Sequence, residues 1–340
     1  MFRLESISQE EGETVSLQGR LSNHAGFGLN DRDASSFVRG IILRGYHLPF
    51  AVSPWPVFKL NHRSALQHEQ FVSAANSELL MAGCIVQSNE RPWVCSPLSV
   101  VENVNGKLRL VLDLRYVNQF LPEQKFKYEG LNLVPQMFEK GDHFFTFDLK
   151  SGYHHVDIHA DFWTYLGFSW GSGSTRKFYM FKVLPFGLAS VCYVFTKLLR
   201  PLVQRWRNKG IRAIVYINDG IGASKTKALN EAHRDIVISD LEQAGFVLNI
   251  PKYCLKPQQI GKWLGFIIDL LKGKFYVPED KLESLKAAIN AYPFARAPVK
   301  SLAKIVWKII SMYLAIGPVS RLRTRAINSR HLWSDSVVIR

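Results

Sequence analysis

Acidic and amide side chains at the ends of apolar segments are the residues in this sequence best suited to metal chemistry. Asp148 lies in the apolar run 143–149, and Asn218 and Asp219 lie at the centre of the segment 213–223. Two carboxylates at neighbouring strand ends would suit Mg²⁺, which prefers oxygen ligands and typically takes one or two carboxylates plus substrate phosphates. Two such ions can hold both oxygens of an in-line phosphoryl displacement. A carboxylate at a strand end is also an ordinary turn or cap residue, so spacing alone leaves both interpretations open.

The apolar patterns around these residues predict an α+β protein. We expect strands or hairpins at 100–118, 143–149, 165–183, 213–223, 246–250 and 263–269, and helices at 64–81, for about 20 residues after Pro185-Phe186-Gly187, at 227–244 and from 278 onward. Asn105-Gly106 is a strong hairpin turn signal. The order strand, hairpin, helix, hairpin, helix, strand favours an antiparallel sheet with helices on one face. Residues 1–60 are expected to lie across the body as an extension.

The composition indicates a globular protein with an anionic partner. A hydrophobic content of 47% and an aromatic content of 12% exclude a disordered chain. The net charge of +15 favours nucleic acid as the partner. The four cysteines have no metal-ligand spacing, which predicts free thiols in a reducing compartment. With no signal peptide and no apolar run of about 20 residues, we expect an intracellular protein in the cytoplasm or nucleus, without a membrane.

Two further groups of charged or polar residues have competing interpretations. Arg200, Arg205, Arg207 and Lys209 fall on the long helix after residue 187, where they could follow a run of phosphates or form a solvated face. His154 and His155 resemble a metal pair, but adjacent residues on an extended segment point to opposite faces. We interpret the two histidines as packing residues.

Five segments together resemble the motifs of reverse transcriptases, in the order that this family shows. Residues 109–118 are similar to the fingers motif, 147–156 to the palm motif and 184–189 to the nucleotide-facing loop. Residues 216–220 are similar to the Tyr-x-Asp-Asp hairpin, and 263–266 to the primer-grip strand. The resemblance covers residues 97 to about 270 and is strongest to the DIRS-type retroelements, which integrate with a tyrosine recombinase.

The resemblance implies a right-hand polymerase fold with fingers, a palm and a helical thumb. In this chain it implies an N-terminal extension at 1–60, a fingers-like part at 61–142, a palm at 143–270 and a thumb- or connection-like helical part at 271–340. No carboxylate set of an RNase H domain is found up to residue 340, so we expect none. The implied activity is RNA-directed DNA polymerisation by two-metal nucleotidyl transfer, with dNTP and an RNA/DNA primer–template as partners. The oligomeric state stays open.

The family's functional residues carry over to matching positions. Asp148, the Leu149 carbonyl and Asp219 would hold Mg²⁺, with Asn218 in the third catalytic position. Arg109, Lys107, Tyr153, Phe186, Gly187 and Lys252 would contact the nucleotide, and Trp263, Leu264 and Gly265 would form the primer grip. A guanidinium matches phosphate oxygens bidentately, and glycine permits close backbone approach. Tyr153 as a core residue and Lys252 as a surface lysine are the alternatives.

Asn218 is the main departure from the family pattern, because it replaces the first aspartate of the hairpin. An amide keeps the shape and loses one negative charge. Losing a transition-state interaction of roughly 3–5 kcal/mol would slow synthesis several hundred- to several thousand-fold. We therefore expect a reverse transcriptase-like domain with weakened or lost synthesis. The alternative is a non-catalytic retroelement remnant that binds primer–template. A second departure is the segment 101–105, which lacks the usual lysine and leaves Lys107 as its substitute.

Overall fold

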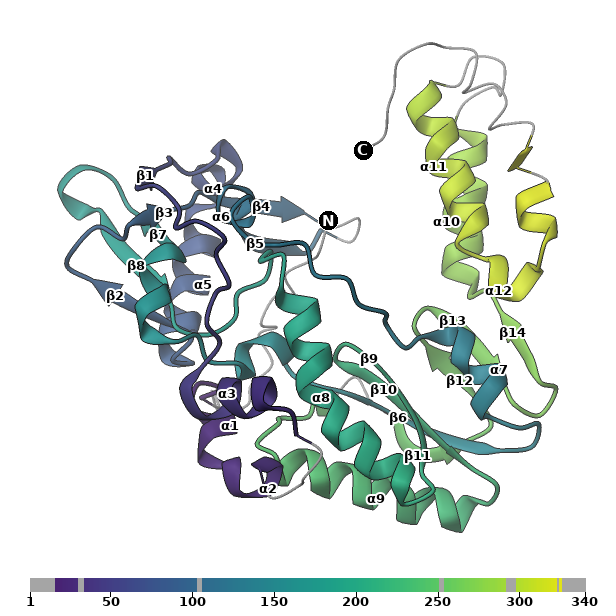
Figure 1. Ribbon diagram of the computed structural model, residues 1–340. Helices are drawn as coiled ribbons and strands as arrows, with labels where there is room; N and C mark the ends of the chain where they lie inside the picture. Colours follow the sequence, from purple (N-terminus) through teal and green to yellow (C-terminus); the bar gives the residue numbers. More distant parts are fainter. Residues whose placement is uncertain are drawn as a thin grey trace.

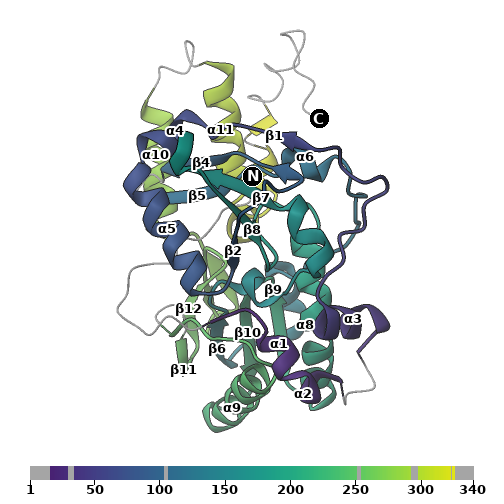
Figure 2. The same cartoon turned by 90° about the vertical axis from the view of Figure 1, so that its left-hand side faces the viewer.

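Three lobes make up the molecule in the computed structural model, which describes residues 16–29, 34–102, 106–250, 254–291, 298–322 and 324–325. A central lobe carries the acidic residues. A first lobe, built mainly from residues 57–118, and a C-terminal helical lobe rise from the same end of the central lobe in both Figure 1 and Figure 2. The β9–β10 turn lies at that end of the central sheet in Figure 1.

The central lobe is built on a four-stranded antiparallel sheet in the order β11-β6-β10-β9. Side chains alternate between the two faces of a strand. Phe145 and Phe147 therefore join the core beneath the helices, whereas Phe144 joins a second core on the opposite face. The strands are β6 (His143–Asp148), β9 (Arg212–Tyr216), β10 (Asp219–Ser224) and β11 (Cys254–Gln258).

Two long helices, α8 (Val191–Asn208) and α9 (Lys227–Gln243), cover the first face of this sheet. Thr226 begins α9, since its hydroxyl accepts the Leu229 N–H. The opposite face is covered by α7 (Val134–Met137), preceded by the 3₁₀ turn η1 (Leu131–Leu133), and by a three-stranded sheet. That sheet consists of β12 (Ile260–Trp263), β13 (Phe266–Asp269) and β14 (Lys274–Tyr276). The predicted antiparallel sheet with its helical face is confirmed.

Basic residues of α8 mostly tie this helix to its neighbours. The guanidinium of Arg205 and the ammonium of Lys209 lie 3.2 and 3.6 Å from the Asp240 carboxylate of α9. Arg207 donates two hydrogen bonds to the Glu129 carboxylate, at 2.8 and 2.7 Å. Arg200 is exposed. Three of the four cations therefore hold the lobe together and form neither a solvated face nor a run of free cations.

The first lobe contains a five-stranded sheet in the order β1-β3-β7-β8-β2, with the helices α4 and α5 beside it. The predicted hairpin at 165–183 forms β7 and β8, which pair with strands from 57–95. The hairpin β4–β5 forms a separate two-stranded sheet. The bounds are β1 (Val57–Phe58), α4 (Arg63–Gln67), α5 (Glu69–Met81), β2 (Ile85–Ser88), β3 (Val94–Cys95), β4 (Leu98–Glu102), β5 (Leu108–Leu112), α6 (Arg115–Asn118), η3 (Ala160–Tyr165), β7 (Gly167–Trp170), η4 (Gly173–Thr175) and β8 (Lys177–Phe181).

The described part of the N-terminal segment runs from the central lobe to the first lobe. Its helices are α1 (Arg20–Asn23), α2 (Ala25–Leu29) and α3 (Ser36–Arg44). The Arg20 guanidinium donates to the Gly245 carbonyl at 2.9 Å, beyond the end of α9. The Tyr46 N–H donates to the Asp157 carbonyl at 2.7 Å before the chain reaches β1.

The C-terminal lobe contains α10 (Glu279–Asn290), α11 (Val299–Ile310) and α12 (Tyr313–Ile316). Leu302 and Val306 of α11 are buried and pack with Ile310, so this helix has one apolar face. This core is separate from the two cores of the central sheet.

Other local predictions concern cysteines and membrane spans. All four cysteines are free thiols, as predicted, and burial raises the pKa of Cys84 to about 12. Within the described residues, no helix combines the length and the apolar character needed to cross a bilayer.

Several predicted boundaries are wrong. The predicted helix 64–81 is divided at His68, whose ring Nδ1 donates to the Ser64 carbonyl and so takes the acceptor that the helix would use. The predicted hairpin 100–118 ends at Leu112 and is followed by the helix α6; residues 103–105 of its turn lie outside the described part.

Two predicted strands after α9 are also wrong. Within the described residues, the segment 246–250 makes a single bridge, Leu149 to Leu248, and the strand that pairs with β6 on the side away from β10 is β11. Pro257 conceals β11 in the sequence, but β11 is an edge strand, where proline is tolerated. The segment 263–269 is divided between β12 and β13, because Leu264 (φ 44°) and Gly265 (φ 73°) form a turn.

Candidate functional site

The strands β6 and β10 bring the two predicted carboxylates together. Asp148 is the last residue of β6, Asp219 is the first residue of β10, and the two are direct partners in the antiparallel register. Directly opposed residues have Cβ atoms about 4.5–5.5 Å apart. Asp148 is only 4% exposed, whereas Asp219 is half-buried. The pairing that the sequence predicted for these two residues is present.

The two-residue turn between β9 and β10 presents Asn218 to the same place. Ile217 has φ 57°, which is rare for a β-branched residue and is typical of strain at functional sites. The Leu149 N–H donates to the Asn218 carbonyl at 3.0 Å. A Cβ on Gly152 would lie 3.1 Å from the Asn218 Cβ, so glycine leaves room for the turn.

Two amides donate to the Asp148 carboxylate. The Asn218 Nδ2 donates to Oδ1 at 2.8 Å, and the Asn249 Nδ2 donates to Oδ2 at 2.5 Å. The Asn249 N–H also donates to the Asp148 carbonyl at 2.8 Å. The sequence does not single out Asn249, because the segment 246–250 has the pattern of an ordinary strand. Its only sequence signal is its position three residues before Lys252.

The side chains gathered here carry the type of ligand atom that a magnesium ion takes. Asp148, Asp219 and the Asn218 side chain carry oxygen atoms, which are the ligands that this ion prefers. Within the described part of the chain, no three histidine, cysteine or acidic residues come together in a way that could hold a metal. The site therefore holds two negative charges where three carboxylates would hold three. The Asn218 side chain now turns its N–H₂ toward Asp148; a half-turn of the amide would present its oxygen.

The predicted nucleotide-pocket residues lie next to one another. The Tyr153 ring lies in the 3₁₀ turn η2 (Gly152–His155), 4.8 Å from the Phe186 ring between centroids, with its hydroxyl 3.3 Å from the Cys192 sulfur. Burial raises the pKa of Tyr153. Tyr153 is 7% exposed, so it is a core residue that also contacts Phe186.

Gly187 adopts φ 92°, a conformation that favours glycine, and a Cβ there would lie 3.2 Å from the Leu112 carbonyl oxygen. The Asn118 side chain secures this loop, because its amide N–H donates to the Gly187 carbonyl and its oxygen accepts the Ala189 N–H, each at 2.8 Å. The last residue of the 109–118 motif therefore positions the 184–189 motif.

The predicted phosphate-contacting residues come from the β4–β5 hairpin. Arg109 stands opposite Val101, and its buried Nε has no hydrogen-bond partner. Lys107 is exposed just before β5. Neither makes a contact with Asp148 or Asp219 that the structure defines. Lys252 lies outside the described residues.

Two of the predicted primer-grip residues, Leu264 and Gly265, form a turn, which corrects the expectation of a strand, whereas Trp263 ends β12. Trp263 is 4% exposed and packs in the second core of the central sheet. Leu264 and Gly265 follow it between β12 and β13, and a Cβ on Gly265 would meet the Lys281 ammonium at 2.7 Å. The turn therefore lies against the first helix of the C-terminal lobe.

The predicted packing histidines are both buried. The His154 ring lies near Phe186 and Phe181, and neither of its nitrogens has a hydrogen-bond partner. The His155 Nδ1–H donates to the Gly152 carbonyl, and its Nε2 accepts the Val247 N–H at 3.0 Å. They lie on a 3₁₀ turn, so the extended segment that the sequence suggested is wrong.

Comparisons with known proteins agree with this arrangement. Residues 101–268 match the family model described as "Reverse transcriptase (RNA-dependent DNA polymerase)". The chain is 25% identical over 273 residues to the retrovirus-related Pol polyprotein from transposon 297 of Drosophila melanogaster, covering 78% of this chain. It is 30% identical over 199 residues, 56% of this chain, to a genome polyprotein of Petunia vein clearing virus. The chain spans 24% of the first polyprotein and 8% of the second.

Solved structures share the fold. A foamy viral protease-reverse transcriptase in complex with double-stranded DNA superimposes with a TM-score of 0.69 at 17% identity, covering 98% of this chain and 59% of that one. The right-hand polymerase fold expected from the sequence is therefore confirmed. Residues 101–268 therefore match the reverse transcriptase family model, and the chain is similar to retrotransposon Pol polyproteins.

Proposed function

We propose that this domain is built for RNA-directed DNA polymerisation and that Asn218 weakens or abolishes synthesis. The observation that supports both parts is the direct pairing of Asp148 with Asp219, together with the amide of Asn218 donating to Asp148 at 2.8 Å. The pairing provides the family's acidic platform. The amide supplies a neutral group where the family places a carboxylate.

Asp148, Asp219 and the Leu149 carbonyl are the groups proposed to hold Mg²⁺. When bound, the ions would supply Lewis-acid stabilisation of the attacking and leaving oxygens. Asn218 contributes at most a neutral oxygen, and only after its amide turns away from Asp148. Asn249 keeps the Asp148 carboxylate in a fixed orientation. The platform is therefore preorganised and short of one negative charge.

Six residues are proposed to position the dNTP. Arg109 has a buried Nε without a partner, which an anionic phosphate would satisfy. Lys107 and Lys252 would add positive charge. Tyr153, with Phe186 and Gly187, would form the floor of the pocket and exclude a ribose 2′-OH. The Trp263-Leu264-Gly265 turn would support the primer.

The proposed partner is an RNA/DNA primer–template. Foamy viral protease-reverse transcriptases of the same fold are solved with double-stranded DNA and with an RNA/DNA hybrid. The net charge of +15 suits such a polyanion. We assign residues 1–60 to an extension, 61–142 to fingers, 143–270 to a palm and 271–340 to a thumb-like part, with the β7–β8 hairpin joining the fingers sheet. We also propose the DIRS-type subgroup, on the motif resemblance, and an intracellular location.

Primer extension with Mg²⁺ or Mn²⁺ tests the proposal. We expect little synthesis by the natural sequence and several hundred- to several thousand-fold more from Asn218→Asp, which restores roughly 3–5 kcal/mol of transition-state stabilisation. Asp148→Asn added to Asn218→Asp should remove the gain. As a second readout, Mg²⁺ should raise the unfolding temperature of Asn218→Asp more than that of the natural sequence.

Two results would lead to other conclusions. Full synthesis by the natural sequence, unimproved by Asn218→Asp, would contradict the role given to Asn218. Duplex binding without synthesis in either variant would favour the alternative function, a non-catalytic remnant that binds primer–template. Duplex binding alone cannot separate the two functions, since both require it.

A further inference from the structure

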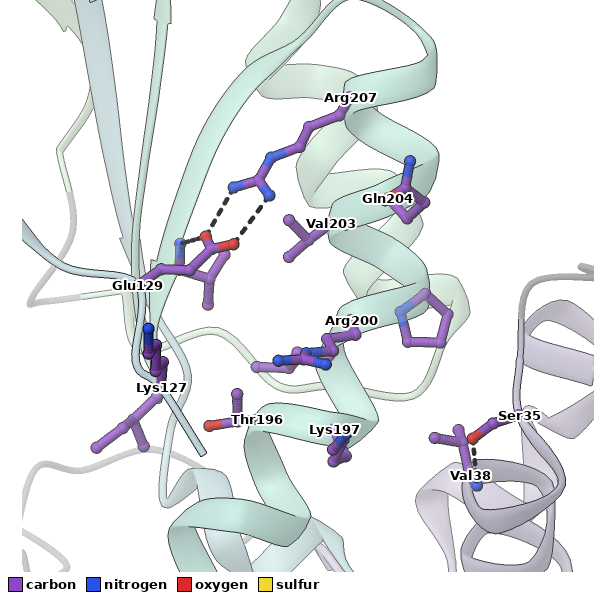
Figure 3. A pocket seen from close by; sticks show the side chains of 14 residues that line it. Ser35, Val38, Lys127, Glu129, Thr196, Lys197, Arg200, Val203, Gln204 and Arg207 are labelled. Atoms are coloured by element: carbon purple, nitrogen blue, oxygen red, sulfur yellow. Dashed lines mark hydrogen bonds and ion pairs between the residues drawn. The ribbon is translucent and has the colours of Figure 1, made fainter. Parts of the chain in front are cut away.

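A cavity of about 470 Å³ lies beside α8 and is lined by neither Asp148 nor Asp219. Its walls come from α8, the linker 127–129 and α3, and it reaches Val215 of β9 and Ile217 of the hairpin turn. Figure 3 shows Arg207 and Glu129 joined at one end and Lys127, Lys197 and Arg200 grouped toward the other. The cavity therefore borders the back of the catalytic-type hairpin but is a distinct space.

The charge of this cavity is strongly positive. Among the described residues, Glu129 is the only acidic one in the lining, and it is neutralised by the bidentate pair with Arg207 at 2.8 and 2.7 Å. Lys127, Lys197 and Arg200 have no carboxylate within 4.0 Å in the described part of the chain. Three uncompensated cations around one cavity favour an anionic occupant.

Polar and apolar groups in the wall define the rest of the occupant. The Thr196 hydroxyl is buried without a hydrogen-bond partner and lines the cavity. A buried polar atom without a partner is costly, and an acceptor on a ligand would satisfy it. Most of the remaining wall is apolar, with Leu199, Val203 and Val215 among its residues, and Ser35 and Gln204 add polar groups. An anion that also carries an apolar body matches this combination.

We propose that the cavity binds one unpaired nucleotide of single-stranded nucleic acid, a contact that rests on the proposed function and extends it. The phosphates would lie between Lys197 and Arg200, the Thr196 hydroxyl would donate to the sugar or phosphate, and the nucleoside would pack on the aliphatic wall. A volume of about 470 Å³ suits one nucleotide. Only an unpaired base can turn into such a cavity, because duplex bases are stacked and paired.

The test compares single-stranded and blunt duplex oligonucleotides by fluorescence anisotropy, using the full chain at several salt concentrations. Lys197→Gln with Arg200→Gln should weaken single-strand binding at least about tenfold at low salt. The slope of log affinity against log salt should fall by about 1.4, since each lost phosphate contact removes about 0.7 for a single strand. Blunt duplex binding should stay within about twofold, because paired bases do not enter the cavity and the duplex therefore loses no phosphate contact there.

Two variants provide the controls. Lys227→Gln with Lys272→Gln removes the same charge from exposed positions away from the cavity and should leave the single-strand affinity nearly unchanged. Thr196→Val removes the hydroxyl at nearly constant volume. It should weaken single-strand binding several-fold with an unchanged salt slope, because no charge is lost.

The outcomes separate this proposal from the proposed function. If Lys197→Gln with Arg200→Gln keeps full single-strand affinity while duplex binding is intact, the cavity proposal is wrong and the proposed function stands. Equal binding of base-free polyphosphate, with no effect of Thr196→Val, would overturn the nucleotide site and leave only a charged surface. If the natural sequence binds neither duplex nor single strand, both proposals fail.

Discussion

At the scale of single residues, the Asp148 site carries an amide, Asn218, where the reverse transcriptase hairpin motif has a carboxylate. Asn218 keeps the turn geometry and donates a hydrogen bond to the carboxylate with which an aspartate would instead share a metal. Asn249 donates to the other oxygen of Asp148. The two amides can satisfy the hydrogen-bonding capacity of the Asp148 carboxylate without a cation. An aspartate at position 218 would instead repel that carboxylate, and a bound cation would have to offset the repulsion. The sequence shows the lost charge, but it cannot show that the replacement amide has a partner.

The buried histidines beside this site predict how stability depends on pH. Burial lowers the pKa of His154 to about 4 and that of His155 to about 3. Both are therefore neutral in the folded protein, while the unfolded chain takes up protons below about pH 6.5. The stabilisation is complete above pH 6.5 and is lost as the pH falls toward 4 and 3, by about 1.4 kcal/mol per pH unit for each histidine.

Replacing either histidine by phenylalanine should flatten the pH profile of the free energy of unfolding between about pH 6.5 and 4. His154→Phe loses no hydrogen bond, so its stability at pH 7 should be kept or raised. His155→Phe leaves the Gly152 carbonyl and the Val247 N–H without partners, which should cost roughly 1–3 kcal/mol for each at every pH. Denaturant titrations across this range measure both effects. An unchanged slope in His154→Phe would contradict the neutral, buried state.

At the scale of elements, two glycines explain how β10 fits beside β6. Gly220 and Gly222 stand opposite Phe147 and Phe145 in the register. A Cβ on Gly220 would lie 2.0 Å from the Phe147 ring, and one on Gly222 would lie 2.5 Å from the Phe145 ring. The rings lie across the glycines, so the close pairing that sets Asp219 beside Asp148 depends on them.

Gly220→Ala should therefore destabilise the protein by about 3 kcal/mol or more, the upper end of the usual cost of overpacking. Adding Phe147→Leu should recover part of the loss, giving a non-additive double-mutant cycle. Gly26→Ala is the control, because no atom lies within 4 Å of its new Cβ and its effect should stay within about 1 kcal/mol. Additive losses for Gly220→Ala and Phe147→Leu would show that the ring does not cause the clash.

Sequence patterns located most elements of the central sheet, and the misses have physical causes. The apolar run of β6, the turn beside Asp219 and the periodic face of α8 are local signals, and each formed the expected element. Pro257 made the edge strand β11 difficult to predict from the sequence. The Leu264-Gly265 turn lies inside an apolar run. It requires a positive φ at Leu264, and a leucine in the sequence gives no signal for that conformation.

The same limit applies to the site. The family motifs pointed to Asp148, Asp219, Tyr153 and Phe186, and the structure brings these side chains into two adjoining pairs. The sequence does not single out Asn249 or Asn118, because each side chain contacts a partner that is distant in the sequence. Their donors meet acceptors 101 and 69 residues away, at Asp148 and Gly187. A spacing pattern along one segment carries no information about such contacts.

At the scale of the whole molecule, the lobes differ greatly in how much apolar surface they bury. α8 alone buries nine residues, among them Phe195 and Trp206, in the largest core. α11 buries only Leu302, Ile305 and Val306, and its lobe has a separate small core. Because local stability follows buried apolar contacts, the C-terminal lobe should open without unfolding the central lobe.

Native-state hydrogen exchange on the intact chain measures this difference. Amides of α11 should exchange at least about 100-fold faster than those of α8, which corresponds to about 3 kcal/mol less opening free energy. If the C-terminal lobe serves as a thumb, adding a primer–template duplex should slow exchange in α11 and leave α8 unchanged, since binding stabilises the folded form of what it contacts. Equal protection of α11 and α8 without nucleic acid would show one cooperative unit. Faster exchange of α11 that no duplex slows would remove the thumb assignment while leaving the palm intact.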